Sequence, residues 1–98
     1  MSSVTLTDQE IEKALAELPG WTRSTSAKVN TIQRVFEFQD FVRTMQFVNK
    51  VAEAAEGANH HPDIDIRYNK VTMALTSHDS GGVTNRDVKM AKKISEIQ

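Results

Sequence analysis

The sequence predicts a single α+β domain over residues 1–98, with the element order α-β-β-α-β-β-α. Apolar residues recur at intervals of three and four in residues 7–18, 39–56 and 84–94, which indicates three helices. Two pairs of short segments lie between these helices. Their residues are β-branched or alternate apolar with polar, which indicates four strands. This order is typical of an antiparallel sheet with its helices packed on one face. We therefore expect a four-stranded antiparallel sheet in one domain.

The first helix should begin at Thr7. Thr7 and Glu10 have the spacing of a capping box, in which each side chain bonds the backbone N–H of the other residue. The helical pattern stops at Pro19, because proline and the glycine after it break a helix. Trp21 then falls in a short strand, and residues 29–38 are rich enough in Val, Ile, Thr and Phe to form the second strand.

The central helix is predicted over residues 39–56, with apolar residues on two of its faces. One face holds Phe41, Met45 and Val48, and the other holds Phe47, Val51 and Ala54. A helix that is apolar around much of its circumference must be covered on more than one side. One face can pack on the sheet, and a large apolar patch is unusual on a monomer. We therefore expect other copies of the chain to cover the second face.

Two more strands and the last helix follow. Residues 63–68 alternate apolar with polar side chains, which is typical of a half-buried strand. Asn69-Lys70 supplies a two-residue turn. Alternation continues through residues 71–77, so His78 is expected at the strand end and off the apolar face. The last helix should open at Thr84, after a break at two consecutive glycines.

Composition excludes several functional classes. A formal charge of −1 argues against direct nucleic-acid binding, which needs a basic surface. The absence of cysteine excludes disulfides and thiolate sites. No run reaches the ~18 apolar residues of a membrane helix, and the N-terminus does not have the pattern of a signal peptide. We expect a cytoplasmic protein with no membrane partner.

All three histidines lie within nineteen residues, at the ends of predicted elements. His60 and His61 follow the central helix, and His78 ends a strand. Two carboxylates, Glu56 and Asp87, lie close to this stretch in the sequence. Histidine both gives and accepts protons near neutral pH. The grouping predicts a proton-transfer site.

The order and spacing of these residues resemble the pterin-4a-carbinolamine dehydratases. The resemblance rests on Glu56, His60-His61-Pro62, Tyr68, His78 and Asp87 and extends over roughly residues 6–97. Further landmarks are Pro19-Gly20-Trp21, Phe36-x-Phe38-x-Asp40-Phe41, Tyr68-Asn69-Lys70-Val71 and Ser77-His78 followed by Gly82-x-Thr84.

The resemblance implies a function. The family dehydrates a 4a-hydroxytetrahydropterin to a quinonoid dihydropterin, as a step of tetrahydropterin recycling, without a redox cofactor or metal. It also implies a homotetramer, built as a dimer of dimers through helix contacts and sheet edges. A general acid must protonate the departing hydroxyl and a base must accept a proton from N5, each worth roughly 10²–10⁴ in rate. We expect His60 and His78 to form this acid–base pair and His61 to position the pterin.

Other residues have two readings. Asp87 either orients a histidine or is the N3 acid of a capping box with Thr84. Glu56 contacts the site or is a solvated helix residue. Trp21 stacks on the pterin or belongs to the core. The expected substrate-binding set is Glu56, His60, His61, Pro62, Ser77, His78 and Trp21.

Two other functional classes compete with the dehydratase. Imidazole suits zinc, copper or nickel, so the three histidines could form a metal site. However, adjacent histidines usually point apart and no acidic ligand has suitable spacing, so we expect neither metal nor cofactor. The second alternative is a non-catalytic dimerisation module of coactivator type. Animal relatives pair in this way with a homeodomain transcription factor.

Overall fold

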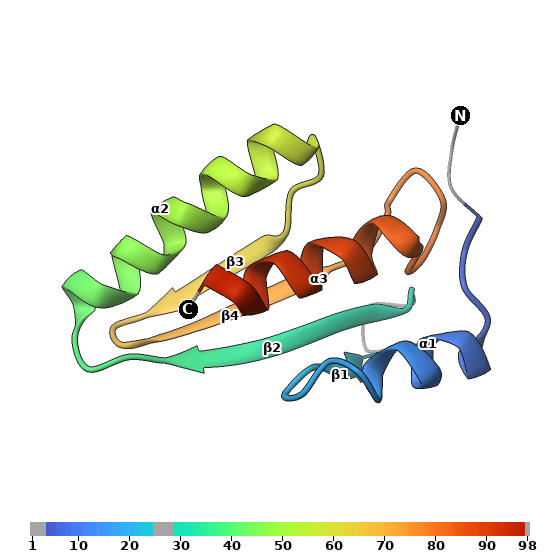
Figure 1. The fold of residues 1–98 in the computed structure, drawn as a ribbon, viewed down its shortest axis with the longest axis horizontal. Coiled ribbons are helices and arrows are strands. Elements are labelled where there is room, and N and C mark those ends of the chain that lie inside the picture. The colour runs from blue at the N-terminus through green and yellow to red at the C-terminus, as the bar shows by residue number, and fades with distance from the viewer. Residues whose placement is uncertain (1–3, 25–28, 98) are drawn as a thin grey trace.

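The computed structural model, which describes residues 4–24 and 29–97, has three helices on one face of a four-stranded antiparallel sheet (Figure 1). The strand order is β1-β2-β4-β3. The elements are α1 (Asp8–Leu15), β1 (Thr22–Ser24), β2 (Thr31–Glu37), α2 (Phe41–Ala58), β3 (Asp63–Arg67), β4 (Lys70–Leu75) and α3 (Asn85–Ile97). The predicted fold class and element order are confirmed. Within the described ranges, no helix has the length and apolarity to cross a membrane.

The predicted start of α1 is also confirmed. The Glu10 N–H donates to Thr7 Oγ1 at 3.2 Å, and the Thr7 N–H donates to Glu10 Oε1 at 2.8 Å. Hydrogen bonding from the backbone N–H of Thr7, and secondarily from its side chain, lowers the pKa of Glu10, because it favours the ionised carboxylate. The helix ends at Leu15, earlier than Pro19, and a series of turns leads to β1.

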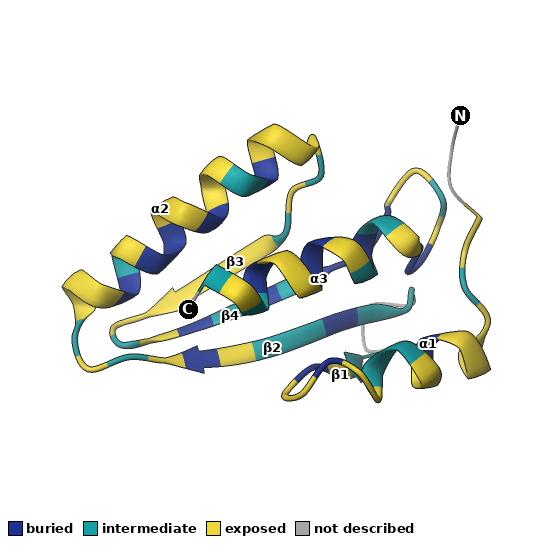
Figure 2. Ribbon diagram, viewed as in Figure 1, coloured by how far each residue is buried: buried dark blue, intermediate teal, exposed yellow. Residues whose placement is uncertain are grey.

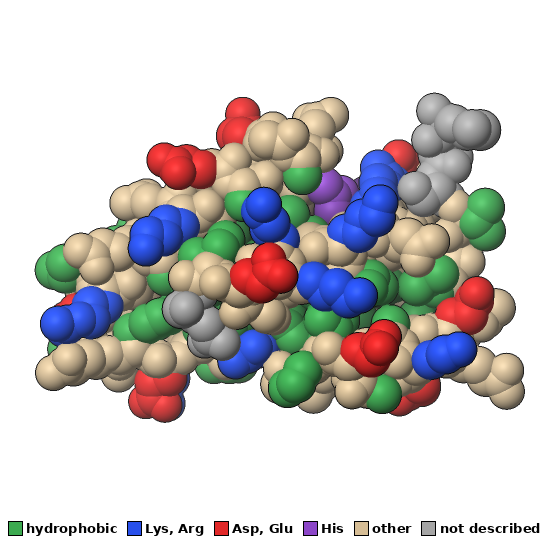
Figure 3. Space-filling view, viewed as in Figure 1, with side chains coloured by type: hydrophobic (Ala, Val, Ile, Leu, Met, Phe, Trp, Pro, Cys, Tyr) green, Lys and Arg blue, Asp and Glu red, His purple; other side chains and the backbone are tan. Residues whose placement is uncertain are grey.

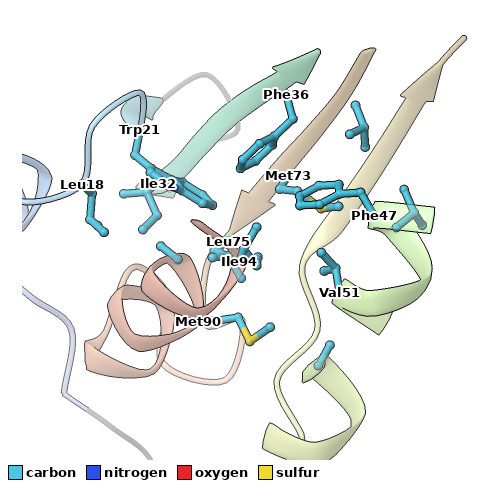
Figure 4. Close-up of a cluster of buried hydrophobic side chains, with 14 of the residues drawn as sticks. Leu18, Trp21, Ile32, Phe36, Phe47, Val51, Met73, Leu75, Met90 and Ile94 are labelled. Atoms are coloured by element: carbon cyan, nitrogen blue, oxygen red, sulfur yellow. The ribbon is translucent and has the colours of Figure 1, made fainter. Parts of the chain in front are cut away.

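The core lies between the sheet and the helices (Figure 4). Cross-strand pairs such as Ile32 with Leu75 and Phe36 with Val71 put apolar residues of β2 and β4 on the same face. Phe47 of α2 packs on this face, with its ring centroid 4.8 Å from that of Phe36. The labelled core residues are Leu18, Trp21, Ile32, Phe36, Phe47, Val51, Met73, Leu75, Met90 and Ile94.

The expected division of α2 into a sheet-facing side and a partner-facing side is wrong in its details. Phe47 and Val51, which we assigned to the face left for a partner, are 4% and 0% exposed and belong to the core. The large apolar residues that α2 leaves exposed are instead Phe41 and Val42, at 48% and 65%. The side of α2 that carries Phe47 packs on the sheet, because Phe47 contacts Phe36 in β2 and Phe38 just after it.

The strand predicted over residues 63–68 is confirmed as β3, but the expectation that it is half-buried is wrong within one chain. All five residues of β3 are exposed, as Figure 2 shows along the strand. Ile64 and Ile66 pair with Met73 and Val71, so they lie on the helix-facing side of the sheet. They remain 38% and 37% exposed because β3 is the edge strand and the helices do not extend fully over it.

Candidate active site

The end of α2 fixes the position of the histidine pair. Asn59 adopts the left-handed conformation with φ of 52°, which asparagine tolerates better than most residues. Its N–H bonds Glu56 O at 3.2 Å, and the His60 N–H bonds Ala55 O at 3.1 Å. This double closure is a Schellman motif. It turns the chain sharply, so that His60 emerges at a defined point between α2 and β3.

His60 is joined to Asp87 at the first turn of α3. Its Nε2 lies 2.6 Å from Asp87 Oδ1, and the two side chains are 11% and 0% exposed. The second oxygen, Oδ2, accepts from the Ser77 hydroxyl and from the Thr84 N–H, each at 2.8 Å. Thr84 Oγ1 also lies 2.8 Å from Ser77 Oγ. These partners compensate the carboxylate for its burial, which is costly for an unpaired charge.

These contacts determine which ring nitrogen of His60 carries a proton. An ionised carboxylate only accepts hydrogen bonds, so Nε2 must donate to Asp87. The other nitrogen, Nδ1, is then free to accept a proton when the ring is neutral and to donate one when the ring is charged. Asp87 therefore caps α3 by accepting from the Thr84 N–H and also orients His60. The structure thus contains both contacts that the sequence presented as alternatives.

His61 forms a separate pair with Glu56, through its Nε2 and the Oε2 of the carboxylate. These side chains are 55% and 78% exposed, so water screens this pair far more than the buried one. The adjacent histidines thus turn toward different carboxylates. Within residues 4–24 and 29–97, no three His, Asp or Glu side chains are grouped as metal ligands would be.

A cavity of about 550 Å³ lies between α2 and α3 and reaches His60. This volume is typical of small-molecule sites. In Figure 3, a histidine and several Lys and Arg side chains are visible on the face that carries these helices. The lining residues are Ala54, Gly57, Ala58, His60, Arg86, Lys89, Met90 and Lys93.

Arg86 stands beside His60 in this cavity with one donor unused. Its Nη2 lies 2.6 Å from Asp79 Oδ1, and this hydrogen bond lowers the pKa of Asp79. Its Nε is buried and has no hydrogen-bond partner among the described residues. A buried donor without a partner is unusual in a folded protein and calls for a physical reason.

Comparison with known proteins identifies the family. Residues 4–97 match the family model described as pterin 4 alpha carbinolamine dehydratase. The chain belongs to this family. A Koribacter versatilis protein, named provisionally as a pterin-4-alpha-carbinolamine dehydratase, is 58% identical over 95 residues, which cover 97% of each chain.

Solved structures of pterin dehydratase relatives agree with the fold. The crystal structure of a transcriptional coactivator/pterin dehydratase from Brucella melitensis matches with a TM-score of 0.89 and 38% identity, over 95% of this chain and 97% of the other. A pterin dehydratase-like RuBisCO assembly factor of the alpha-carboxysome matches with a TM-score of 0.67 and 18% identity, over 80% and 88%. The second match concerns the fold alone.

The family pattern is only partly gathered at the cavity. His60, Asp87 and Ser77 are joined by hydrogen bonds through the Asp87 carboxylate. Of these three residues, only His60 lines the cavity. His78 is exposed in the turn after Ser77 and makes no hydrogen bond to another described residue. Pro62, half-buried, follows the histidine pair directly before β3.

Trp21 does not stack at the cavity, in contrast to one of its two predicted roles. It is 4% exposed, and its Nε1 donates to Ser95 Oγ at 2.8 Å. Its ring meets Phe36 edge-on, with centroids 6.2 Å apart. It is a core residue because these contacts enclose it.

Sequence reasoning missed Asn59, Arg86, Lys89 and Lys93. Asn59 had a usable signal, since asparagine after a helical pattern favours the left-handed C-terminal position. The three cations had none. Basic residues on an amphipathic helix are usually solvated, and only the packing of α2 beside α3 makes them line a cavity.

Proposed function

We propose that this chain dehydrates a 4a-hydroxytetrahydropterin to a quinonoid dihydropterin and water, with His60 as the central proton carrier. The observation that carries the proposal is the buried His60–Asp87 pair at a cavity of small-molecule size. Family membership supports the same reaction class.

The reaction needs proton transfer and little else. The C4a–O bond breaks, the N5–H bond breaks, and a C4a=N5 double bond forms. Hydroxide is a poor leaving group, so an acid must protonate the oxygen as it departs as water. A base accepts the N5 proton, so the protein regains the proton that it gave.

His60 suits this exchange because Asp87 holds only one of its two ring nitrogens. With Nε2–H directed at Asp87 Oδ1, the free Nδ1 is the atom that exchanges protons with the substrate. The buried carboxylate is itself held by Ser77 and the Thr84 N–H, so it fixes the orientation of the ring. In hydrolase triads a carboxylate likewise sets the histidine tautomer, although there it accepts from Nδ1–H and leaves Nε2 to exchange the proton.

We assign the second proton transfer to His78 and the positioning of the pterin to His61, as the sequence predicts. His78 directly follows Ser77, whose hydroxyl bonds the same Asp87 carboxylate. His61 directly follows His60 and is tethered by Glu56 at the end of α2. Each role is separable by kinetics, because a proton carrier affects kcat and a positioning residue affects KM.

The proposed assembly is a homotetramer. Support comes from the exposed apolar residues at the start of α2, Phe41 and Val42, and from the exposed edge strand β3. An unpaired strand edge and apolar side chains beside it favour association with another copy.

The second candidate is a non-catalytic binding module of coactivator type. The same exposed residues, Phe41 and Val42, favour it, and the Brucella relative is described as both a coactivator and a dehydratase. Catalysis distinguishes the two candidates, since a binding module needs no proton-transfer pair.

The test is a stopped-flow assay of dehydration, with the 4a-hydroxytetrahydropterin generated chemically. We expect the wild-type protein to accelerate loss of the carbinolamine and His60→Ala to reduce kcat by roughly 10² or more. Lys92→Ala, an exposed change on α3 outside the cavity lining, should leave kcat unchanged. A wild-type rate equal to that of the uncatalysed reaction would exclude the enzyme and favour the binding module.

A further inference from the structure

The cavity beside His60 is basic along one wall. Arg86, Lys89 and Lys93 are spaced three and four residues apart on α3, so they share one face of the helix. Apart from His60, the other lining side chains are uncharged, and the lining includes no carboxylate. The positive charges therefore meet no opposite charge within the cavity itself.

The two lysines are also unpaired elsewhere. Lys89 and Lys93 have no carboxylate within ion-pair distance among the residues that the structure describes. Like charges four residues apart on a helix repel each other and lower its stability. An anion bound between them would reverse this repulsion.

Arg86 adds an independent observation. Its Nε is buried without an acceptor, although its Nη2 is held by Asp79. A buried donor destabilises the fold when it has no partner. The Arg86 side chain as a whole is 36% exposed and lines the cavity, so its guanidinium group adds a third positive charge at the end of the basic wall nearest His60.

The length of the wall fits a bicyclic ring with a substituent. Lys93 lies seven positions after Arg86, which corresponds to roughly 10 Å along the helix axis. α2 and α3 run in opposite directions side by side, so His60 and Arg86 lie at one end of the cavity, with Ala54 and Lys93 toward the other (Figure 1). A ring held at His60 would direct its substituent toward the lysines.

We infer that the cavity selects a pterin whose substituent carries a negative charge, as a carboxylate or a phosphate. The ring lies at His60 and Arg86, and Lys89 and Lys93 bind the charged group. This inference rests on the proposed function and specifies its substrate class.

The test measures binding apart from catalysis, with oxidised, fluorescent pterins. The probes are 6-carboxypterin, 6-hydroxymethylpterin and the phosphate ester of 6-hydroxymethylpterin, which differ in the charge at one position. Wild-type protein should bind at least one anionic probe about tenfold more tightly than the neutral one, the scale of two exposed ion pairs. The tighter of the two anionic probes identifies the group as carboxylate or phosphate.

The matched variants are Lys89→Gln/Lys93→Gln and Lys13→Gln/Lys92→Gln. Both remove two positive charges, but Lys13 and Lys92 are exposed residues outside the cavity. The first variant should lose the preference for the anionic probe and keep the affinity for the neutral one. The second should retain the preference, and 0.5 M salt should weaken it because exposed charges are screened.

Three outcomes would overturn the inference: equal affinities in the wild type, equal losses in the two variants, or binding of neither kind of probe. The stopped-flow dehydration assay reports separately on the proposed function. Normal dehydration with equal affinities overturns the inference alone. Selective anion binding without dehydration supports the inference and overturns the catalytic proposal.

Discussion

The Nε2 of His60 lies 2.6 Å from Oδ1 of Asp87, which is completely buried at the first turn of α3. The other oxygen of this carboxylate holds the Thr84 N–H that begins the helix. One side chain therefore joins the end of α2 to the start of α3. Helix stability and histidine orientation depend on the same group, which leads to the first prediction.

Asp87→Ala should lower both stability and kcat. The loss of the cap costs about 0.5–2 kcal/mol, and His60 loses the partner that sets its tautomer. Asp87→Asn should be less destabilising, yet its amide leaves only one oxygen to accept hydrogen bonds. If that oxygen keeps Thr84, the amide nitrogen faces His60, and the ring must change tautomer. We expect kcat to fall by roughly 10²–10⁴.

Thermal melting and steady-state kinetics on the two variants check this prediction. Arg86→Gln is not a suitable control because Arg86 lines the cavity, whereas Lys92→Ala is exposed and outside it. A normal kcat in Asp87→Asn, together with a lower melting temperature, would show that Asp87 is a cap only.

The other two histidines should differ in their kinetic effects. His61→Ala should raise KM with a small change in kcat if His61 positions the pterin. His78→Ala should lower kcat by roughly 10² or more if it transfers a proton. Initial rates over a range of substrate concentrations separate the two effects. Wild-type kcat in His78→Ala would remove His78 from the chemistry and leave His60 as the proton carrier.

The oligomer should depend on Val42 and Ile66, in place of the core residues first assigned to the interface. Val42→Glu and Ile66→Glu put charge on exposed apolar side chains of α2 and β3, at 65% and 37% exposure. Light scattering should give a mass four times the 11.0-kDa chain for the wild type and a smaller particle for these variants.

The control for the edge strand is Thr22→Glu in β1, the strand at the opposite edge of the sheet. It should leave the mass unchanged. Phe47→Glu should instead unfold the chain, since it buries a charge in the core. A wild-type mass of a single chain at micromolar concentration would contradict the tetramer.

Gly57 should be replaceable without harm to the fold. It lies in α2, and a methyl group added at its Cα would meet nothing within 4 Å. Alanine favours the helix by about 0.5–1 kcal/mol over glycine, so Gly57→Ala should raise the melting temperature. Gly57→Leu should keep the fold but weaken pterin binding, because its side chain enters the cavity. Equal affinities in the wild type and Gly57→Leu would place the pterin elsewhere.

Asp79 should titrate below its ordinary range. The hydrogen bond from Arg86 lowers its pKa below 3.8, and the contact is lost as the pH falls through the lowered value. A depressed carboxyl pKa stabilises the folded state above the unfolded pKa. Titration of the Asp79 carboxyl by NMR checks this, and Arg86→Gln should return the pKa toward 3.8. An unchanged value in that variant would assign the shift to another cause.

The sequence alone determined the order of elements and the local signals that begin and end them. The Thr7–Glu10 capping box depends on residues within a few positions of each other, so its pattern is visible along the chain. The His60-His61 pair after the central helix was visible for the same reason. The turn predicted at Asn69-Lys70 was wrong by one residue: the turn is Tyr68-Asn69, and Lys70 begins β4 because it pairs with Arg67. The predicted helix over residues 39–56 was displaced by two residues, because Asp40 caps it and Asn59 ends it.

Tertiary structure decided which faces are buried and which side chains meet. Phe47 and Val42 are both apolar residues of α2. Phe47 is buried because it packs against Phe36 of β2, whereas Val42 stays exposed. His60 contacts Asp87 across 27 positions of sequence, and Lys89 and Lys93 line a cavity only because α3 lies beside α2. Helical periodicity shows which residues share an apolar face of a helix. Which residues that face packs against depends on how elements distant in the sequence come together. For this reason, the sequence indicated the chemistry of the site, and the fold supplied its partners.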